Sequence, residues 1–333
     1  MSLTDHRVFA LGGQVGHSRG MVPPKIAFVA SGGAARGLAH LGVLRACEEL
    51  GLVPDIFVGT SAGAIVAASY GQNIPLDVLL DAYRLPWRRR HNGPRLDPSL
   101  FLGAPSREEL FDLGHLASGL FSLHKLERYL SQNLPINDFR RLPRAVWVTA
   151  VDIDTGERVV FGRGHEEGTP VSEAVAAACC VPGLFRPYRI GDRYLIDGEV
   201  LRTFSADIAV EAGATVVILS NVYRPTRSTD AKRSLARRGA GAVLRQSASL
   251  LLSEKGRIGC ELHGVNYPNV QLLEIVPDLG PYGYLNTWPA RPMIMRGYGA
   301  ALRALATAKE HGVFGELVPT ELVEAPSLHR AVG

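Results

Sequence analysis

The most restrictive feature of the sequence is a pair of apolar, strand-length runs, each followed by a glycine-containing turn and a helix-like segment. The first run is Lys25 to Ala30, followed by the turn SGGAARG and a helical pattern that ends at Leu50. The second is Asp55 to Val58, followed by the turn GTSAG and a small-residue helix that ends at Tyr70. A right-handed crossover in such a βαβα unit predicts parallel, neighbouring strands with both turns at their carboxyl ends.

Apolar runs and helical periodicity continue along the rest of the chain. We predict strands at Ala145 to Val151, Val159 to Phe161, Thr215 to Leu219 and Val270 to Ile275, and a hairpin at Arg189 to Ile196. We predict helices at Leu76 to Tyr83, from a Ser122 cap to about Leu134, and at Val171 to Val181, Ser234 to Ser253 and Pro292 to Glu310. No repeat or low-complexity linker separates these elements. We therefore predict one α/β domain over residues 23–315, with an N-terminal extension at 1–22 and a C-terminal tail at 316–333.

The composition argues against several classes of protein. The 333 residues are 46% hydrophobic and 20% charged, as in an ordinary globular protein. Apolar stretches fall short of the roughly 20 residues that span a bilayer, and the first residues lack a secretory apolar core, so we expect a cytoplasmic protein. A net charge of +4 does not indicate nucleic-acid binding. Metal-site and disulfide spacings are absent among the cysteines, which we expect to be buried thiols: Cys47, Cys179, Cys180 and Cys260.

Ser61 lies at the centre of the GTSAG turn, between a predicted strand and a predicted helix. In this context a Gly-x-Ser-x-Gly turn exposes the serine hydroxyl, and Gly59 and Gly63 remove side chains that would clash with neighbouring backbone. The helix that follows directs its N-terminal dipole at the hydroxyl, which stabilises a developing negative charge. Ser61 is therefore a candidate nucleophile, although the same pentapeptide also suits a small-residue turn packed against a sheet.

The turn from Ser31 to Gly37 can present successive backbone N–H groups in a concave nest. The N–H groups of Gly32, Gly33 and Ala34 suit an acyl oxyanion or, equally, a phosphate. Nucleotide-binding loops have GxxxxGK[ST] or GxGxxG spacing, which this turn lacks. Because it faces the serine turn one crossover away, we favour an oxyanion hole.

A nucleophilic serine needs a base, and the sequence offers two kinds of candidate. His263, His311 and His329 follow Ser61 in an order that a conventional triad permits, but none lies in a telling motif. Asp197 ends a strand-like run and enters an Asp-Gly turn, which places it at a predicted strand end. Asp-Gly is also a common turn dipeptide, so the pattern of residues alone leaves the base open.

Together these residues resemble the patatin-like phospholipase family, whose pattern is a GGGxRG-type loop, a GxSxG turn and a later Asp-Gly-[Gly/Ala] motif. The similarity spans most of residues 25–220, including the segments LAHLGVLRACEELGL, VTAVDIDTGERVVF and SEAVAAACCVPGLFRPY. The resemblance implies a three-layer α/β/α fold with a mostly parallel sheet. It also implies a lipase, esterase or phospholipase A-type acyl hydrolase that acts on lipid esters through a dyad of Ser61 and Asp197, without cofactor or metal. Since a free aspartate has a pKa near ~3.9, we expect burial to raise the pKa of Asp197.

Two residues depart from the family pattern. Ala34 stands at the third glycine of the loop, and because its Cβ disfavours positive φ, we expect an ordinary backbone conformation there. Glu199 follows Asp-Gly where the family has Gly or Ala, and we expect it to face solvent or bind an arginine. Arg36 matches the family's arginine. With Gly37 we expect it to support the loop, although a surface arginine at a helix start also fits.

Residues 84–121 are a lid candidate, because their first part is crowded with Pro, Gly and Arg. Trp87 beside Arg88 to Arg90 suits peripheral contact with an anionic membrane, although a solvated loop has the same composition.

Two further interpretations of the whole chain stay open. A histidine-using α/β-hydrolase esterase is disfavoured because its oxyanion loop normally lies further upstream of the serine turn. A non-catalytic lipid- or nucleotide-binding protein on the same fold is favoured slightly by Ala34 and Glu199.

Overall fold

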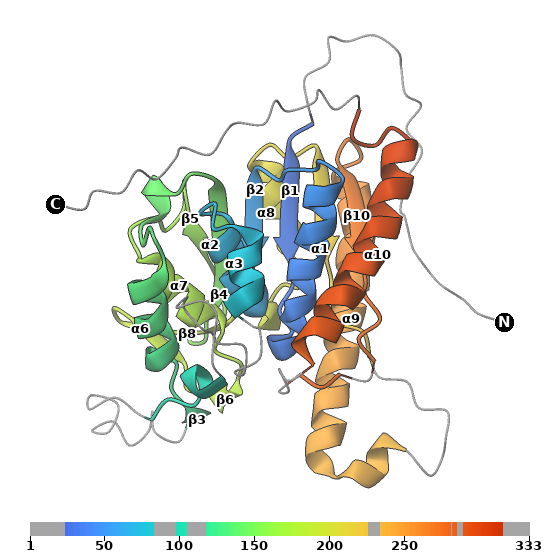
Figure 1. The fold of residues 1–333 in the computed structure, drawn as a ribbon. Coiled ribbons are helices and arrows are strands. Elements are labelled where there is room, and N and C mark those ends of the chain that lie inside the picture. Colours follow the sequence, from blue (N-terminus) through green and yellow to red (C-terminus); the bar gives the residue numbers. More distant parts are fainter. Residues whose placement is uncertain are drawn as a thin grey trace.

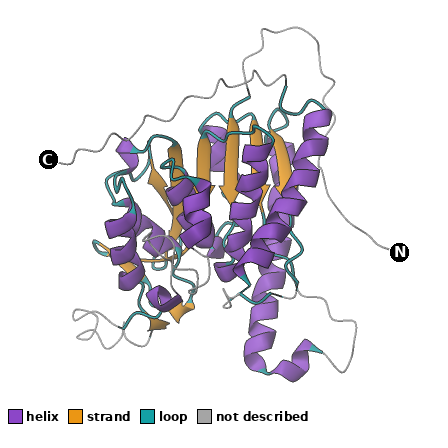
Figure 2. Cartoon of the chain, in the orientation of Figure 1, coloured by secondary structure: helices purple, strands orange, loops and turns teal. Residues whose placement is uncertain are grey.

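An eight-stranded sheet forms the centre of the molecule, with helices on both faces (Figures 1 and 2). The computed structural model describes residues 24–82, 98–104, 118–225, 234–280, 282–284 and 289–315. In spatial order the strands are β10 (Gln271–Ile275), β9 (Val216–Ser220), β1 (Ile26–Ala30), β2 (Ile56–Gly59), β4 (Ala145–Asp152), β8 (Arg193–Asp197) and β7 (Tyr188–Ile190), and β5 (Arg158–Gly162) also pairs with β4. Strands β10 to β4 are mutually parallel, whereas β8 and β5 run antiparallel to β4. The predicted α/β fold with a mostly parallel sheet is confirmed.

The helices form the two outer layers of the fold. One face of the sheet is covered by α1 (Leu38–Glu49), α2 (Ala62–Tyr70), α3 (Leu76–Ala82), α6 (His124–Asn133), α7 (Val171–Ala178) and α10 (Ala290–Glu310). The other face is covered by α8 (Ala206–Glu211) and α9 (Ala240–Asn266). Short 3₁₀ turns η1 (Ala34–Gly37), η2 (Pro98–Phe101), η3 (Phe139–Arg141), η4 (Gly198–Val200) and η6 (Leu235–Arg238) connect these elements. Strands β3 (Gly119–Phe121) and β6 (Gly183–Phe185) pair separately.

Strand β1 shows why its sequence is a continuous apolar run. Ile26 and Phe28 point into the core beneath α1 and α10, whereas Ala27 and Val29 point into the core beneath α8 and α9. A central parallel strand is covered on both faces, so every residue along it is apolar.

The predicted βαβα unit is confirmed by the pairing of β1 with β2. The two strands are parallel neighbours, with Ala30 opposite Gly59. Both turns therefore leave the sheet at the same edge, the edge at which the parallel strands end. This common edge brings two glycine-containing segments together although a whole helix separates them in the chain.

Several boundaries differ from the sequence predictions. Helix α9 continues well past Ser253, to Asn266, and α7 ends at Ala178 because the chain turns there toward β6. Leu123, not Ser122, is the N-cap of α6, and Ser122 only approaches the N–H of His124, at 3.5 Å. Short elements α8, β3 and β6 were not predicted, because they contain too few residues to show a period.

Parts of the predicted organisation lie outside the described residues. These are the extension at 1–22, the tail at 316–333 and most of the lid candidate, including Trp87 and Arg88 to Arg90. Of residues 84–121, only 98–104 and 118–121 are described. In the part of the chain that the structure covers, no helix has both the length and the hydrophobicity of a membrane span.

Candidate active site

Ser61 occupies a strained turn between β2 and α2. Its φ and ψ are 54° and −126°, a conformation that costs an L-residue free energy and is typical of a nucleophile elbow. The flanking glycines permit the tight turn: a Cβ on Gly59 would lie 2.3 Å from the carbonyl oxygen of Gly63, and a Cβ on Gly63 would lie 2.3 Å from that of Ala30. The turn therefore presents the Ser61 side chain at the carboxyl edge of the sheet, ahead of α2.

Strand register brings Asp197 to Ser61. Gly59 of β2 pairs with Val148 of β4. Ser61 follows Gly59 by two residues, just as Ala150 follows Val148. Ala150 in turn pairs with Asp197 on the antiparallel strand β8. The Ser61 side chain lies close enough to the Asp197 carboxyl to influence its pKa. The hydroxyls of Thr60 and Thr149, which adjoin this region, lie 2.6 Å apart. The sheet thus places together two residues that the sequence separates widely.

Asp197 is buried, with 4% of its surface exposed. Burial raises the pKa of its carboxyl to about 6, against the opposing effect of hydrogen bonds from the Glu199 backbone N–H, at 3.0 Å, and from the Ser61 side chain. This shift has the direction expected from the sequence. A carboxylate with this pKa is still mostly ionised at neutral pH and is a stronger base than a solvent-exposed aspartate.

The glycine-containing loop before α1 has an unusual backbone. Gly33 has a φ of 141° and Ala34 a φ of 47°. The prediction of an ordinary conformation at Ala34 is wrong. The loop continues directly into η1, which begins at Ala34. The contacts that hold the loop in this path compensate for the roughly 1–2 kcal/mol that an L-residue loses in the left-handed region. A Cβ on Gly33 would lie 2.3 Å from Cγ2 of Val222, so glycine is required there.

The N–H groups of this loop are not equivalent. Gly32 donates its N–H to Oε1 of Glu199 at 2.8 Å, and Ala35 donates to the carbonyl oxygen of Tyr284 at 2.8 Å. The N–H groups of Gly33 and Ala34 have no acceptor among the described residues. These two donors are consequently available to a ligand beside Ser61.

Glu199 connects the Asp-Gly turn to the glycine-containing loop. The prediction that it faces solvent or an arginine is wrong: its exposed fraction is 3%, and it accepts the Gly32 N–H. Burial, followed by the nearby negative charge of Asp197, raises the pKa of Glu199 to about 8. The ammonium group of Lys255, on α9, donates to the carbonyl oxygens of Glu199 at 2.5 Å and Val200 at 3.0 Å, which anchors the turn.

Arg36 holds the same loop from its other side. It is buried, and its guanidinium donates to the carbonyl oxygens of Tyr282 and Arg224 and to the hydroxyl of Tyr284. The Arg36 guanidinium also lies 4.2 Å from the centre of the Tyr284 ring. Gly37 follows with no room for a side chain, because a Cβ there would lie 2.5 Å from Cβ of Ala62.

His40 was not identified from the sequence as part of this region. Its Nε2 lies 2.9 Å from the carbonyl oxygen of Ser31, and its Nδ1 lies 2.7 Å from the hydroxyl of Ser220. Burial lowers the pKa of His40 to about 4, so the ring is neutral, donating from Nε2 and accepting at Nδ1. With both nitrogens occupied, His40 fixes the start of the loop and is unsuited to act as the base for Ser61.

An apolar cavity of about 300 Å³ opens beside Ser61. Its walls come from the loop and α1, from α2, and from the short elements around β3 and β6, and include Ile65, Phe101, Phe121, Leu184 and Phe185. Phe101 and Phe121 belong to the segment predicted as a lid. The nucleophile candidate therefore lies where a polar hydroxyl meets an apolar chamber suited to a hydrocarbon chain.

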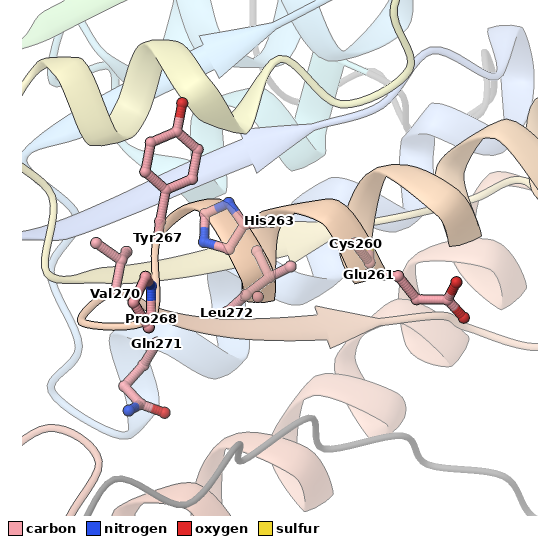
Figure 3. Close-up of a pocket in the computed structure, with 9 residues that line it drawn as sticks. Cys260, Glu261, His263, Tyr267, Pro268, Val270, Gln271 and Leu272 are labelled. Atoms are coloured by element: carbon pink, nitrogen blue, oxygen red, sulfur yellow. The ribbon is translucent and has the colours of Figure 1, made fainter.

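The histidines considered as alternative bases are not brought to Ser61. His263 lies in a separate pocket of about 190 Å³ between the end of α9 and the start of β10 (Figure 3). That pocket is at the amino edge of the parallel strands, opposite to Ser61. His311 follows α10 and bonds the carbonyl oxygen of Thr307. His329 lies outside the described residues.

The four cysteines lie in the interior of the described structure. All four cysteines are buried free thiols, as predicted. Over the described ranges, no group of three or more His, Cys, Asp or Glu side chains is arranged to hold a metal ion.

Comparison with known proteins places these motifs in a family. Residues 28–210 match the patatin-like phospholipase family model, a span that contains Ser61, Asp197 and the glycine-containing loop. An uncharacterized NTE family protein of Mycobacterium tuberculosis is 31% identical over 183 residues, which cover 55% of this chain and 28% of the relative. Mouse patatin-like phospholipase domain-containing protein 6 is 28% identical over 202 residues, 59% of this chain and 13% of the relative. The chain thus spans less than a third of the length of these two relatives.

Among solved structures, the chain is similar to VipD from Legionella pneumophila, with a TM-score of 0.45 and 14% identity over 86% of this chain and 67% of that one. It is also similar to human GIVD cytosolic phospholipase A2, with a TM-score of 0.43 and 13% identity over 89% of this chain and 61% of that one.

Proposed function

Because this chain belongs to the patatin-like phospholipase family, we propose that it hydrolyses acyl esters of lipids, with Ser61 as nucleophile and Asp197 as general base. The observation that carries the proposal is the proximity of these two side chains, with Ser61 in a strained turn at an apolar cavity. Lipid ester hydrolysis explains why the serine is next to a hydrocarbon-lined space.

The reaction begins with a proton transfer. Asp197 accepts the hydroxyl proton of Ser61 as Oγ forms a bond to the carbonyl carbon of the ester. The carbonyl oxygen becomes an oxyanion, which the N–H groups of Gly33 and Ala34 stabilise, assisted by the amino terminus of α2. Gly32 was included in the predicted oxyanion hole, but its N–H is donated to Glu199, so we assign it to holding the loop.

The second half of the reaction regenerates the serine. The carbon–oxygen bond of the ester breaks, and the leaving alcohol takes the proton from Asp197, which leaves an acyl group on Ser61. Water then gives a proton to Asp197 and attacks the acyl carbon, and the released Oγ recovers that proton. The acyl chain occupies the cavity throughout, because its walls are apolar and it opens at Ser61.

Replacement of the nucleophile provides the direct test. We expect Ser61→Ala to lose ester hydrolysis by about 10³-fold or more and to lose covalent labelling by a fluorophosphonate, because no other group replaces Oγ. The matched control is Ser131→Ala, which removes an exposed serine of α6 whose hydroxyl donates to the carbonyl oxygen of Arg128 in the same helix. Hydrolysis of short-chain esters and of phospholipids is measured for each variant. Turnover by purified Ser61→Ala equal to that of the wild type would refute the proposal.

Labelling also separates hydrolysis from simple ligand binding. A non-catalytic lipid-binding protein would bind a fatty acid in the cavity without reacting with the fluorophosphonate. We expect the wild type to become labelled at Ser61 and to release product repeatedly.

A further inference from the structure

Helix α9 extends beyond the sheet that it covers (Figure 1). Its 27 residues extend for about 40 Å, and its amino-terminal part projects past the edge of the sheet at which β1 ends (Figure 1). Its buried residues, Ala242, Ser249, Gly256, Cys260 and His263, follow one face of the helix. The projecting half is Ala240 to Ser253, and we refer to it, together with η6, as the α9 projection.

The outward face of the α9 projection is apolar. Leu244 and Leu251 are 70% and 72% exposed, and they are seven positions apart, so they share the face opposite to Ala242 and Ser249. Val243 and Leu250 flank them and are also exposed. Four large apolar side chains on two turns of one helix make a surface that water solvates poorly.

The charges of the α9 projection are of a single sign. Arg237, Arg238 and Arg245 are exposed, and residues 234–253 contain no aspartate or glutamate. Acidic residues begin at Glu254, where Arg257 pairs with both Glu254 and Glu261. The projecting half is therefore cationic and apolar, whereas the half that covers the sheet is charge-balanced.

The α9 projection is directly connected to the candidate active site. The hydroxyl of Ser249 lies 2.9 Å from that of Tyr284, and Tyr284 lines the cavity beside Ser61. Leu102, which also lines the cavity, and Leu120 of β3 are 52% and 69% exposed. The α9 projection and the strands β3 and β6 lie at the same edge of the sheet (Figure 1).

We propose that the α9 projection docks on an anionic lipid surface, with Leu244 and Leu251 entering the apolar boundary and Arg237, Arg238 and Arg245 meeting lipid phosphates. An amphipathic helix with basic residues binds such a surface by burying its apolar face and by attraction to anionic headgroups. Docking in this orientation presents the cavity to the bilayer. The inference concerns binding and is independent of the chemistry at Ser61.

The test measures binding to vesicles by the Ser61→Ala protein, so that hydrolysis does not change the lipid. Vesicles of phosphatidylcholine alone are compared with vesicles that also contain phosphatidylglycerol. We expect preferential binding to the anionic vesicles. Replacing all three arginines by glutamine is expected to weaken this binding about a hundredfold, and Leu244→Ser with Leu251→Ser at least about tenfold.

Val265→Ser is the matched control, since Val265 is 75% exposed on the same helix but lies at its other end. We expect this variant to bind like the wild type, and thermal unfolding verifies that every variant is folded. Equal binding by the leucine variants and the wild type would overturn the proposal. A change from dimer to monomer in the leucine variants, with vesicle binding unchanged, would also overturn it and assign the face to a second copy of the chain.

Discussion

The turns after β1 and β2 leave the same edge of the sheet, and each contains a non-glycine residue with positive φ, Ala34 at 47° and Ser61 at 54°. The turn after β2 presents a side chain, and its contacts are made by its own residues, the start of α2 and the neighbouring strands β1 and β4. The turn after β1 presents backbone N–H groups, and distant buried side chains hold it: Glu199, Arg36 and His40. A reactive side chain can be built locally, whereas an array of backbone donors depends on the whole fold.

The largest expected effect tests the side-chain turn. We expect Asp197→Asn to lower kcat/KM for a short-chain ester by about 10³–10⁴-fold, because an amide cannot accept the Ser61 proton. In the wild type, kcat/KM is expected to rise with pH through about 6, as the Asp197 carboxyl loses its proton. Asp154→Asn, in an exposed turn, is the control. Retention of more than about a tenth of the activity by Asp197→Asn would show that another group activates Ser61.

Glu199→Gln tests how the backbone turn is held. The folded carboxyl has a pKa of about 8 against 4.5 for an ordinary glutamate, so the folded protein binds a proton that the unfolded chain releases. Stability of the wild type therefore falls as pH rises from 4.5 to about 8, while glutamine keeps an oxygen for the Gly32 N–H and does not titrate. We expect the Tm of Glu199→Gln to rise relative to the wild type across this window.

Thermal unfolding at several pH values measures this difference. Glu157→Gln, at an exposed position, serves as the reference and should parallel the wild type. A Tm difference between Glu199→Gln and the wild type that is constant with pH would mean that Glu199 keeps its charge in the folded protein.

The smallest expected effect tests the strain at Ala34. We expect Ala34→Gly to increase the free energy of unfolding by about 1 kcal/mol, since glycine adopts positive φ without penalty. Activity should change little, because the N–H group remains. Ala35→Gly, at the next residue, where φ is not positive, should instead lower stability by about 0.5–1 kcal/mol. Denaturant unfolding distinguishes the two signs, and destabilisation by Ala34→Gly would contradict the assignment of strain.

Features that depend on local sequence could be predicted, whereas contacts between distant residues could not. The strands, the βαβα unit and the position of the serine turn depend on local periodicity and on glycines within a few residues of Ser61, and the structure contains them. Glu199 and Gly32 are 167 residues apart, and His40 and Ser220 are 180 apart. No local pattern records such contacts, so the burial of Glu199, the backbone of Ala34 and the presence of His40 required the three-dimensional arrangement.

The register of β4 has a consequence for how this site can diverge. Ser61 and Asp197 are aligned by the pairing of β2 and β8 with β4, and the chain between α2 and β4 forms none of these strand pairs. That intervening chain supplies Phe101 and Phe121 to the cavity wall. Insertions, deletions or exchanges there can reshape the acyl chamber while the reacting pair keeps its spacing. Substrate range and chemical mechanism can therefore change separately, and exchange of the chain between α2 and β4 is a direct route to new specificities.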